Sequence, residues 1–169
     1  KQSRPEATAL LALVKGYVAE LDDDPEQAFA HYHGVVDLTA NALHEQQAGS
    51  PGNRAVLEDA LRRMLVIALN NQDSQAALLL LGTLSDLSPV YEPQYAELLR
   101  LTGDVQGAID RYTAYLGKAP KDVSAMFKLG HLFQQIGSTE GAQLAFQMVL
   151  KHQPDNQAAQ QMLAEVARA

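Results

Sequence analysis

The sequence predicts an all-α fold made of antiparallel helix pairs that repeat along the chain, and three observations lead to this prediction. Apolar residues recur at steps of three and four, the period of an α-helix, and no segment alternates apolar and polar residues as a half-buried strand does. Small residues return in one register from pair to pair. Hydrophobic residues make up 47% of the chain but aromatic residues only 6%, a balance that suits closely packed helices better than a β-sandwich.

The clearest helix pair spans residues 123–156. Its landmarks, in chain order, are Met126, Leu129, Gly130, Phe133, Gly137, Ala142, Phe146, Leu150 and Pro154. The small side chains of Gly130 and Ala142 allow the two helix backbones to approach closely, and Phe146 fills the space beside them. Pro154 ends the second helix because proline has no N–H to donate and its ring clashes with a continuing helix.

The same landmarks recur upstream in one register. The small position of the first helix falls at Gly16, Leu65, Ala96 and Gly130, and the alanine position of the second helix falls at Ala28, Ala77, Ala108 and Ala142. Both series step by 49, 31 and 34 residues. The aromatic position holds Tyr32, Leu81, Tyr112 and Phe146, and the terminating proline is Pro89, Pro120 or Pro154, with Ala40 in the first pair. Two positions that keep one register through unequal steps indicate a true internal repeat.

This arrangement resembles the tetratricopeptide repeat, in which a large residue, Leu-Gly, an aromatic residue, a turn, Ala, a second aromatic residue and Pro extend over 34 positions. The match is strong across residues 123–156 and weakest in the first pair, where Lys15 stands at the expected leucine. The resemblance implies a right-handed superhelical solenoid of antiparallel helix pairs, forming a single domain over residues 1–169. Repeats are expected at about 9–47, 54–88, 89–122 and 123–156, with a capping helix at 156–169 that covers the last apolar face.

Unequal repeat lengths predict two local departures from this pattern. The first step exceeds 34 residues by 15, which predicts an elongated helical hairpin with about two extra turns per helix, joined by residues 48–53, with the second repeat beginning near Arg54. The shorter 31-residue step predicts an abrupt junction at Ser88-Pro89. Asp24 followed by Pro25 is typical of a helix start.

Charge and composition exclude several classes of function. The net charge of −7 disfavours nucleic acid as a partner, because an acidic surface repels phosphates. The absence of cysteine excludes disulfides, thiolate metal sites and a cysteine nucleophile. No apolar run approaches the roughly 18 residues of a membrane span. Because the chain starts at Lys1 rather than Met, we expect a processed product or an excised piece, and the compartment, cytoplasm or periplasm, stays open.

Candidate catalytic and metal-binding residues are few. His31 and His33 are two apart on a predicted helix, so their side chains point about 200° apart and cannot share an ion. His33 and Asp37 have the right spacing but lack a third ligand. The acidic run at 22–24 lacks the glycine and glutamate of a calcium loop and is better explained by helix capping. No phosphate-binding loop or hydrolase motif is present, so we expect neither an enzyme nor a cofactor.

The family resemblance also implies where a partner binds. In tetratricopeptide proteins the first helices of successive repeats line a concave groove that receives an extended peptide or a helix. Carried over residue by residue, the groove positions are Leu10, Leu13, Tyr17, Glu20, Asp59, Arg62, Val66, Leu69, Val90, Pro93, Glu97, Arg100, Ser124, Phe127, His131 and Gln134. Packing against neighbouring helices is the alternative for Leu10, Leu13 and Leu69. The residues expected to bind a protein or peptide are Tyr17, Arg62, Val66, Glu97, Arg100, Phe127, His131 and Gln134.

One subfamily grips the terminal carboxylate of a peptide with Lys, Asn and Arg at these positions. That binding mode is not expected here, because the corresponding residues are Leu13, Tyr17, Val66, Glu97 and Phe127. The leading hypothesis is a non-catalytic protein- or peptide-binding scaffold, with a bacterial assembly factor as one example. Two alternatives stay open: a regulatory or docking domain of a larger enzyme, and a self-assembly module whose elongated hairpin forms homo-oligomers. The convex side and the hairpin tip at 48–53 compete with the groove as binding sites.

Overall fold

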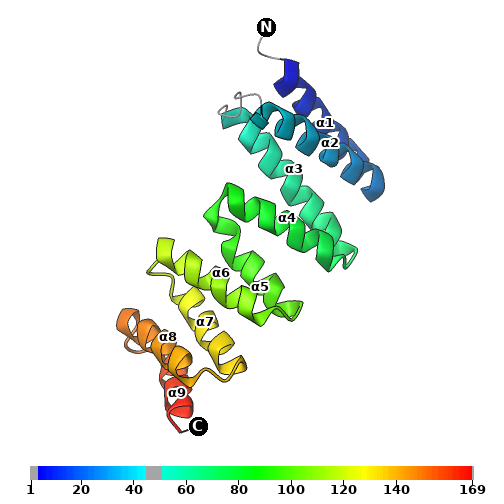
Figure 1. The fold of residues 1–169 in the computed structure, drawn as a ribbon. Helices are drawn as coiled ribbons and strands as arrows, with labels where there is room; N and C mark the ends of the chain where they lie inside the picture. The colour runs from blue at the N-terminus through cyan, green and yellow to red at the C-terminus, as the bar shows by residue number, and fades with distance from the viewer. Residues whose placement is uncertain (1–3, 45–50, 169) are drawn as a thin grey trace. The chain divides into compact units, whose positions relative to one another are not determined.

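The computed structural model describes residues 4–44 and 51–168, without the side chains of residues 4–6, 40–44 and 51. These described residues form nine α-helices and one short 3-10 helix, and they contain no strand (Figure 1). The elements are α1 (Arg4–Leu21), α2 (Pro25–His44), α3 (Pro51–Asn70), α4 (Ser74–Leu87), η1 (Pro89–Tyr91), α5 (Glu92–Leu101), α6 (Val105–Lys118), α7 (Val123–Gln135), α8 (Thr139–His152) and α9 (Gln157–Val166). The predicted all-α fold is therefore confirmed.

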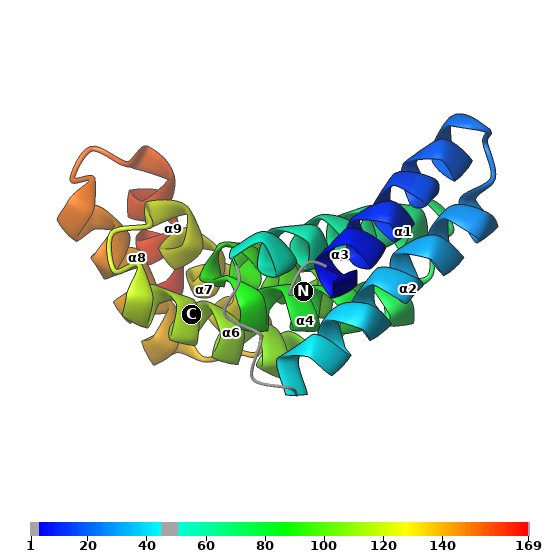
Figure 2. The same ribbon diagram turned by 90° about the horizontal axis from the view of Figure 1, so that it is seen from above.

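The helices group into two compact units. Unit 1 is Lys1–Leu87 and contains α1–α4, and unit 2 is Ser88–Ala169 and contains η1 and α5–α9. Within each unit consecutive helices pack against one another, and α1 also contacts α3. Figures 1 and 2 both show α1 and α2 side by side as an antiparallel pair. The single-domain organisation expected from the sequence stays a prediction.

The small residues of the repeat register lie at close helix contacts. Ala142 and Ala108 have no exposed surface. A Cβ atom added to Gly130 would lie 2.6 Å from the Phe146 ring, and one added to Gly16 would collide with the ring of Tyr32. The prediction that small residues let paired helices approach is confirmed for these pairs.

Helix ends follow from capping side chains and prolines. Asp24 accepts a hydrogen bond from the backbone N of Gln27 at 2.9 Å. The same bond, to the N–H three positions on, is made by Asp73, Asp104, Asp122 and Asn156. It satisfies an N–H that has no partner inside the helix. At the other end, α4, α6 and α8 each stop two residues before a proline, as the sequence predicts.

The turn inside each helix pair has a common backbone conformation. One residue has a positive φ: 57° at Asp23, 57° at Gln72, 95° at Gly103 and 73° at Gly137. The next residue donates its N–H to a carbonyl five positions back, at 2.8–2.9 Å in all four turns. This bond closes the helix end in the manner of a Schellman motif, so the four turns have the same construction.

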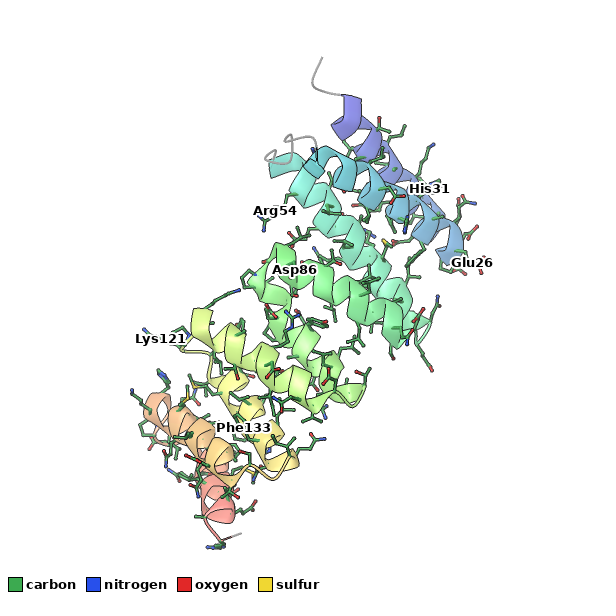
Figure 3. The ribbon with its side chains drawn as sticks, in the orientation of Figure 1. Glu26, His31, Arg54, Asp86, Lys121 and Phe133 are labelled. Carbon is green, nitrogen blue, oxygen red and sulfur yellow. The ribbon has the colours of Figure 1, made fainter. Side chains whose placement is uncertain are left out.

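The first helix of the second repeat begins earlier than predicted. α3 starts at Pro51 rather than near Arg54, so residues 51–53 are helical instead of part of the connection; the rest of that connection, 48–50, lies outside the described residues. Proline fits the first helical position because the N–H it lacks has no partner there anyway. Arg54, labelled in Figure 3, donates from Nη2 to the backbone oxygen of Leu87 at the end of α4.

The predicted changes in helix length are confirmed. α2 and α3 have 20 residues each, whereas α4, α6 and α8 have 14. After the Ser88-Pro89 junction, α5 has only 10 residues. The last helix, α9, buries Ala159 and Val166 and exposes Gln160 and Gln161, which is the amphipathic pattern of a cap. None of the helices in the described part of the chain is long and apolar enough to cross a membrane.

Candidate peptide-binding surface

In unit 1, Tyr17 joins α1 to α3. Its phenol donates a hydrogen bond to the carboxylate of Asp59 on α3. The guanidinium carbon of Arg63 lies 4.0 Å from the centroid of the Tyr17 ring, within the range of a cation–π contact. Tyr17 is half-buried by these contacts, so part of its ring belongs to the helix junction.

A second phenol extends this network to α2. Arg63 Nη1 lies 2.9 Å from Glu20 Oε2, and the Tyr32 hydroxyl donates to the other oxygen of Glu20. Burial raises the pKa of both Tyr17 and Tyr32, and the negative carboxylates that accept their hydrogen bonds raise the pKa further. Both phenols therefore stay protonated donors at neutral pH, and they tie α1, α2 and α3 together.

The other predicted residues of unit 1 lie toward solvent. Arg62 is exposed, and Val66 is 56% exposed. Val66 lines a depression of about 260 Å³ together with Glu20, Asp23, Asp24, Pro25, Arg63, Ile67 and Asn70. Of the apolar groove positions in this unit, Leu13 is only 4% exposed and belongs to the core, whereas Leu10 and Leu69 are about half exposed. The packing alternative therefore applies to Leu13.

In unit 2, α5 and α7 form a second depression, which we call the α5–α7 pocket. It has a volume of about 260 Å³ and is lined by Glu97, Arg100, Tyr112, Lys128, His131, Leu132 and Gln135. Three residues predicted from the sequence, Glu97, Arg100 and His131, thus meet at one place. Because their backbone positions are set by packed helices of a single unit, the pocket is preformed.

Two ion-paired side chains define the α5 side of this pocket. Arg100 donates to Glu97 Oε1 from Nη2 at 2.6 Å and from Nε at 3.1 Å. This hydrogen bonding lowers the pKa of Glu97. Beneath the pair, burial and the charge of Glu97 raise the pKa of Tyr112 to about 12, and its hydroxyl donates to Pro93 O at 3.3 Å. Tyr112 is therefore a neutral donor at physiological pH.

The Glu97–Arg100 pair gives a testable pH dependence. We expect Arg100→Gln to raise the pKa of Glu97 toward the ordinary value of about 4.3, because the strongest stabiliser of the carboxylate is removed. With Arg100 present, the pKa of Glu97 is lower in the folded chain than in the unfolded chain. The pair therefore stabilises the fold at pH values above the unfolded pKa of Glu97, and this stability is lost as the pH falls through the lower, folded-state pKa. NMR titration of the Glu97 carboxyl carbon measures this shift. Lys128→Gln is the control and should shift the pKa less, since Lys128 acts by charge alone.

The α7 side of the pocket carries an aromatic cluster. The rings of Phe127 and His131 meet edge to face with centroids 4.7 Å apart, and each lies 5.6 Å from the buried ring of Phe146. The Gln134 amide oxygen lies 3.2 Å from His131 Nδ1. Phe127 is half-buried and His131 is exposed. The predicted residues Phe127, His131 and Gln134 therefore form one continuous strip along α7.

Of the side chains at these surfaces that were not among the predicted site residues, three are charged or polar groups that directly follow a predicted position. Arg63 is the centre of the unit 1 network, and Lys128 and Gln135 line the α5–α7 pocket. Each follows a predicted position directly in sequence, at Arg62, Phe127 and Gln134. A signal was available for Lys128, because Lys128 and His131 are three apart and so share a helix face. The role of Arg63 depends on Glu20 and Tyr17, which only the packing of α1 on α3 brings close.

No metal centre is evident in the described part of the chain. Its His, Asp and Glu side chains form no group of three that could hold an ion. His33 Nδ1 lies 3.2 Å from Asp37 Oδ2, and both side chains are more than half exposed. This pair is a surface contact of a helix turn, worth little to stability.

Known proteins are similar to this chain both in sequence, over part of unit 2, and in the arrangement of its helix pairs. Residues 99–166, all in unit 2, match the sequence model of the tetratricopeptide repeat. A crystal structure of MamA is similar over 90% of this chain and 82% of its own, with a TM-score of 0.62 and 16% identity. The chain has the tetratricopeptide-repeat fold. A tetratricopeptide repeat protein from Parabacteroides merdae gives a TM-score of 0.65 at 18% identity, over 95% of this chain and 59% of its own.

A further similar structure is that of a second tetratricopeptide-repeat protein. YrrB, described as having an unusual peptide-binding site, is similar over 90% of each chain with a TM-score of 0.53 and 16% identity. At these identities the likeness establishes the tetratricopeptide-repeat fold and no more. A sequence comparison with curated proteins gives no match.

Proposed function

We propose that this chain is a non-catalytic scaffold that binds a protein or peptide segment at the α5–α7 pocket and the adjoining strip of α7. Charged, hydrogen-bonding and aromatic side chains converge at the α5–α7 pocket, and this convergence is the main support for the proposal. Aromatic and arginine side chains dominate binding energy at many interfaces, because they bury a large area and still satisfy polar groups.

The charges of the pocket support an acidic ligand. Arg100, Lys128 and Glu97 line it, and Glu97 is already paired with Arg100. The pocket therefore has a local positive charge on a chain whose net charge is −7. A partner segment carrying a carboxylate would add a favourable contact with Lys128, and it would not have to displace the Glu97–Arg100 ion pair.

The aromatic strip supports an apolar anchor beside that carboxylate. The rings of Phe127 and His131 are fixed by their contacts with Phe146, so little side-chain entropy is lost when a ligand packs on them. We therefore propose a segment with one aliphatic or aromatic anchor and a nearby acidic residue, presented as an extended strand or an amphipathic helix. The described peptide-binding site of YrrB is a precedent for such binding on this fold. A bacterial assembly factor would use a scaffold of this kind.

The test compares the wild-type chain with a double variant in the pocket. Partners captured from a native extract and identified by mass spectrometry are titrated, as purified proteins, against both forms by calorimetry. We expect Phe127→Ala/Arg100→Ala to weaken binding by about 2 kcal/mol or more, the loss typical of a hot spot. Leu144→Ala/Met148→Ala, two exposed residues of α8, is the matched control and should bind as the wild type does.

Two outcomes would argue against this proposal. Binding that survives the pocket variant but is lost in a chain shortened within 48–53 would move the site to the hairpin. Binding lost equally in the α8 control would indicate a site elsewhere on unit 2. Circular dichroism melting of each variant must accompany the titration, because Phe127 also packs against the core.

A further inference from the structure

The outer face of α1 carries an uncovered apolar stripe. Among the described residues, five of the thirteen large apolar side chains that are exposed belong to this one helix: Leu10, Leu11, Val14, Val18 and Leu21, which are 45–86% exposed. The opposite face of α1 is its packed face, with Ala9, Leu13 and Ala19 buried. A cluster of exposed apolar side chains of this kind usually marks an interaction site.

The spacing of the stripe indicates that its partner is a helix. Ala7, Leu11, Val14, Val18 and Leu21 follow one another at steps of four, three, four and three. This is the heptad spacing of a coiled-coil seam, in which two helices pack side by side along a straight apolar line. We call these five residues the α1 seam.

The repeat register supports the same conclusion. In the register that aligns Gly16 with Gly130, Leu11 corresponds to Ala125 and Val18 to Leu132. In unit 2 both of these are buried, 3% and 1% exposed, in a core that also contains residues of α6, the helix preceding α7. Among the residues that the structure describes, no helix covers the equivalent positions on α1, where Leu11 is 56% and Val18 51% exposed. Val14 and Leu21 extend the apolar line where α7 has the polar residues Lys128 and Gln135.

We propose that the α1 seam is a homodimer interface, at which α1 of one copy packs against α1 of a second copy about a two-fold axis. An interface of this symmetry brings a surface against its own copy, so the surface must be self-complementary, and a heptad seam meets that condition. Among the described residues, the other helices carry at most two exposed large apolar side chains each. A second copy therefore offers one surface that matches the seam, which is the seam itself.

Electrostatics permit this pairing in spite of the acidic net charge. Within α1 the heptad positions that flank the seam hold one charged residue, Lys15, and no acidic residue. The last helix, α9, exposes Gln160, Gln161 and Glu165, a polar surface unsuited to the seam. Contact between two α1 helices is favoured over a head-to-tail contact between α1 and α9.

Single-cysteine cross-linking tests the geometry directly, because the chain has no cysteine of its own. In either orientation of the two helices, a two-fold axis at the centre of the seam places Val14 beside Val14 of the second copy. We expect Val14→Cys to form a covalent dimer rapidly with a short bifunctional maleimide. Leu144→Cys on α8, also exposed, is the control and should stay monomeric. Equal cross-linking of the two variants would contradict the proposal.

Light scattering during gel filtration tests the energetics. At about 100 μM we expect the wild-type chain to have twice the mass of one chain, and Leu11→Gln/Val18→Gln to have the mass of one chain with unchanged helix content. Leu144→Gln/Met148→Gln should remain dimeric. A monomeric wild-type chain would overturn the proposal and would indicate that the α1 seam binds a helix of another protein. A dimer that survives the seam substitutions would place the interface elsewhere, for instance at the elongated hairpin.

Discussion

Replacing Phe146 with alanine should lower the free energy of unfolding by about 3–5 kcal/mol, the range found when a buried aromatic ring is deleted. Phe146 has no exposed surface, and its ring touches those of Phe127 and His131. The substitution removes apolar area from the core and leaves a cavity between α7 and α8. Since a domain is stable by only about 5–15 kcal/mol, the loss is a large part of the total.

Urea unfolding followed by circular dichroism measures this effect. The matched control is Leu144→Ala on the same helix, where the side chain is 56% exposed and the change should stay within about 0.5 kcal/mol. If Phe146→Ala destabilised the protein no more than Leu144→Ala, the position of the ring in the core would be wrong.

Replacing Gly130 with leucine should destabilise the protein by about 1–3 kcal/mol through overpacking. A Cβ atom on Gly130 would already lie 2.6 Å from the Phe146 ring, which is enclosed and cannot move aside freely. Gly117→Ala is the control, because a Cβ atom there has no neighbour within 4 Å. It should leave stability unchanged or raise it slightly, since alanine favours the helix over glycine.

A second substitution should partly relieve the first. The second repeat holds Leu65 and Leu81 where the fourth holds Gly130 and Phe146, so the register tolerates two medium side chains in place of a small and a large one. We expect Gly130→Leu/Phe146→Leu to be less destabilised than the sum of its single variants, with a coupling of about 0.5–3 kcal/mol. Strict additivity in urea unfolding would show that the two positions do not share space.

The fold could be predicted from the sequence because close packing of paired helices requires small and large side chains at fixed positions of each repeat. Gly130, Ala142 and Phe146 have fixed spacings that only a close helix pair requires, and their counterparts recur through unequal steps. Helix ends were also predictable, because prolines and capping aspartates act on the backbone within a few residues of their own position. The start of α3 was missed because Pro51 can serve either as a turn residue or as the first residue of a helix, and local sequence does not distinguish these roles.

The candidate site was only partly predictable. The groove positions implied by the family resemblance, placed by the repeat register, identified Glu97, Arg100 and His131, which the structure brings together at one pocket. It could not reveal that Arg63 reaches Glu20 on another helix, because long side chains choose partners by three-dimensional distance. Nor does a groove pattern separate Leu13, which is buried, from Leu10, which is exposed; this difference depends on helix rotation of a few tens of degrees.

The shared turn conformation has a consequence for how the repeats can diverge. Unit 2 has Gly103 and Gly137 at the positive-φ position, but unit 1 has Asp23 and Gln72. This conformation costs roughly 1–2 kcal/mol for a residue such as glutamine and less for aspartate. The Schellman bond and the capping aspartate hold the turn in place even with the less suitable residue. The first two repeats can therefore differ from the consensus residues of the motif and still keep the same backbone conformation in the turn. A glycine at Asp23 or Gln72 should therefore stabilise the turn in which it stands.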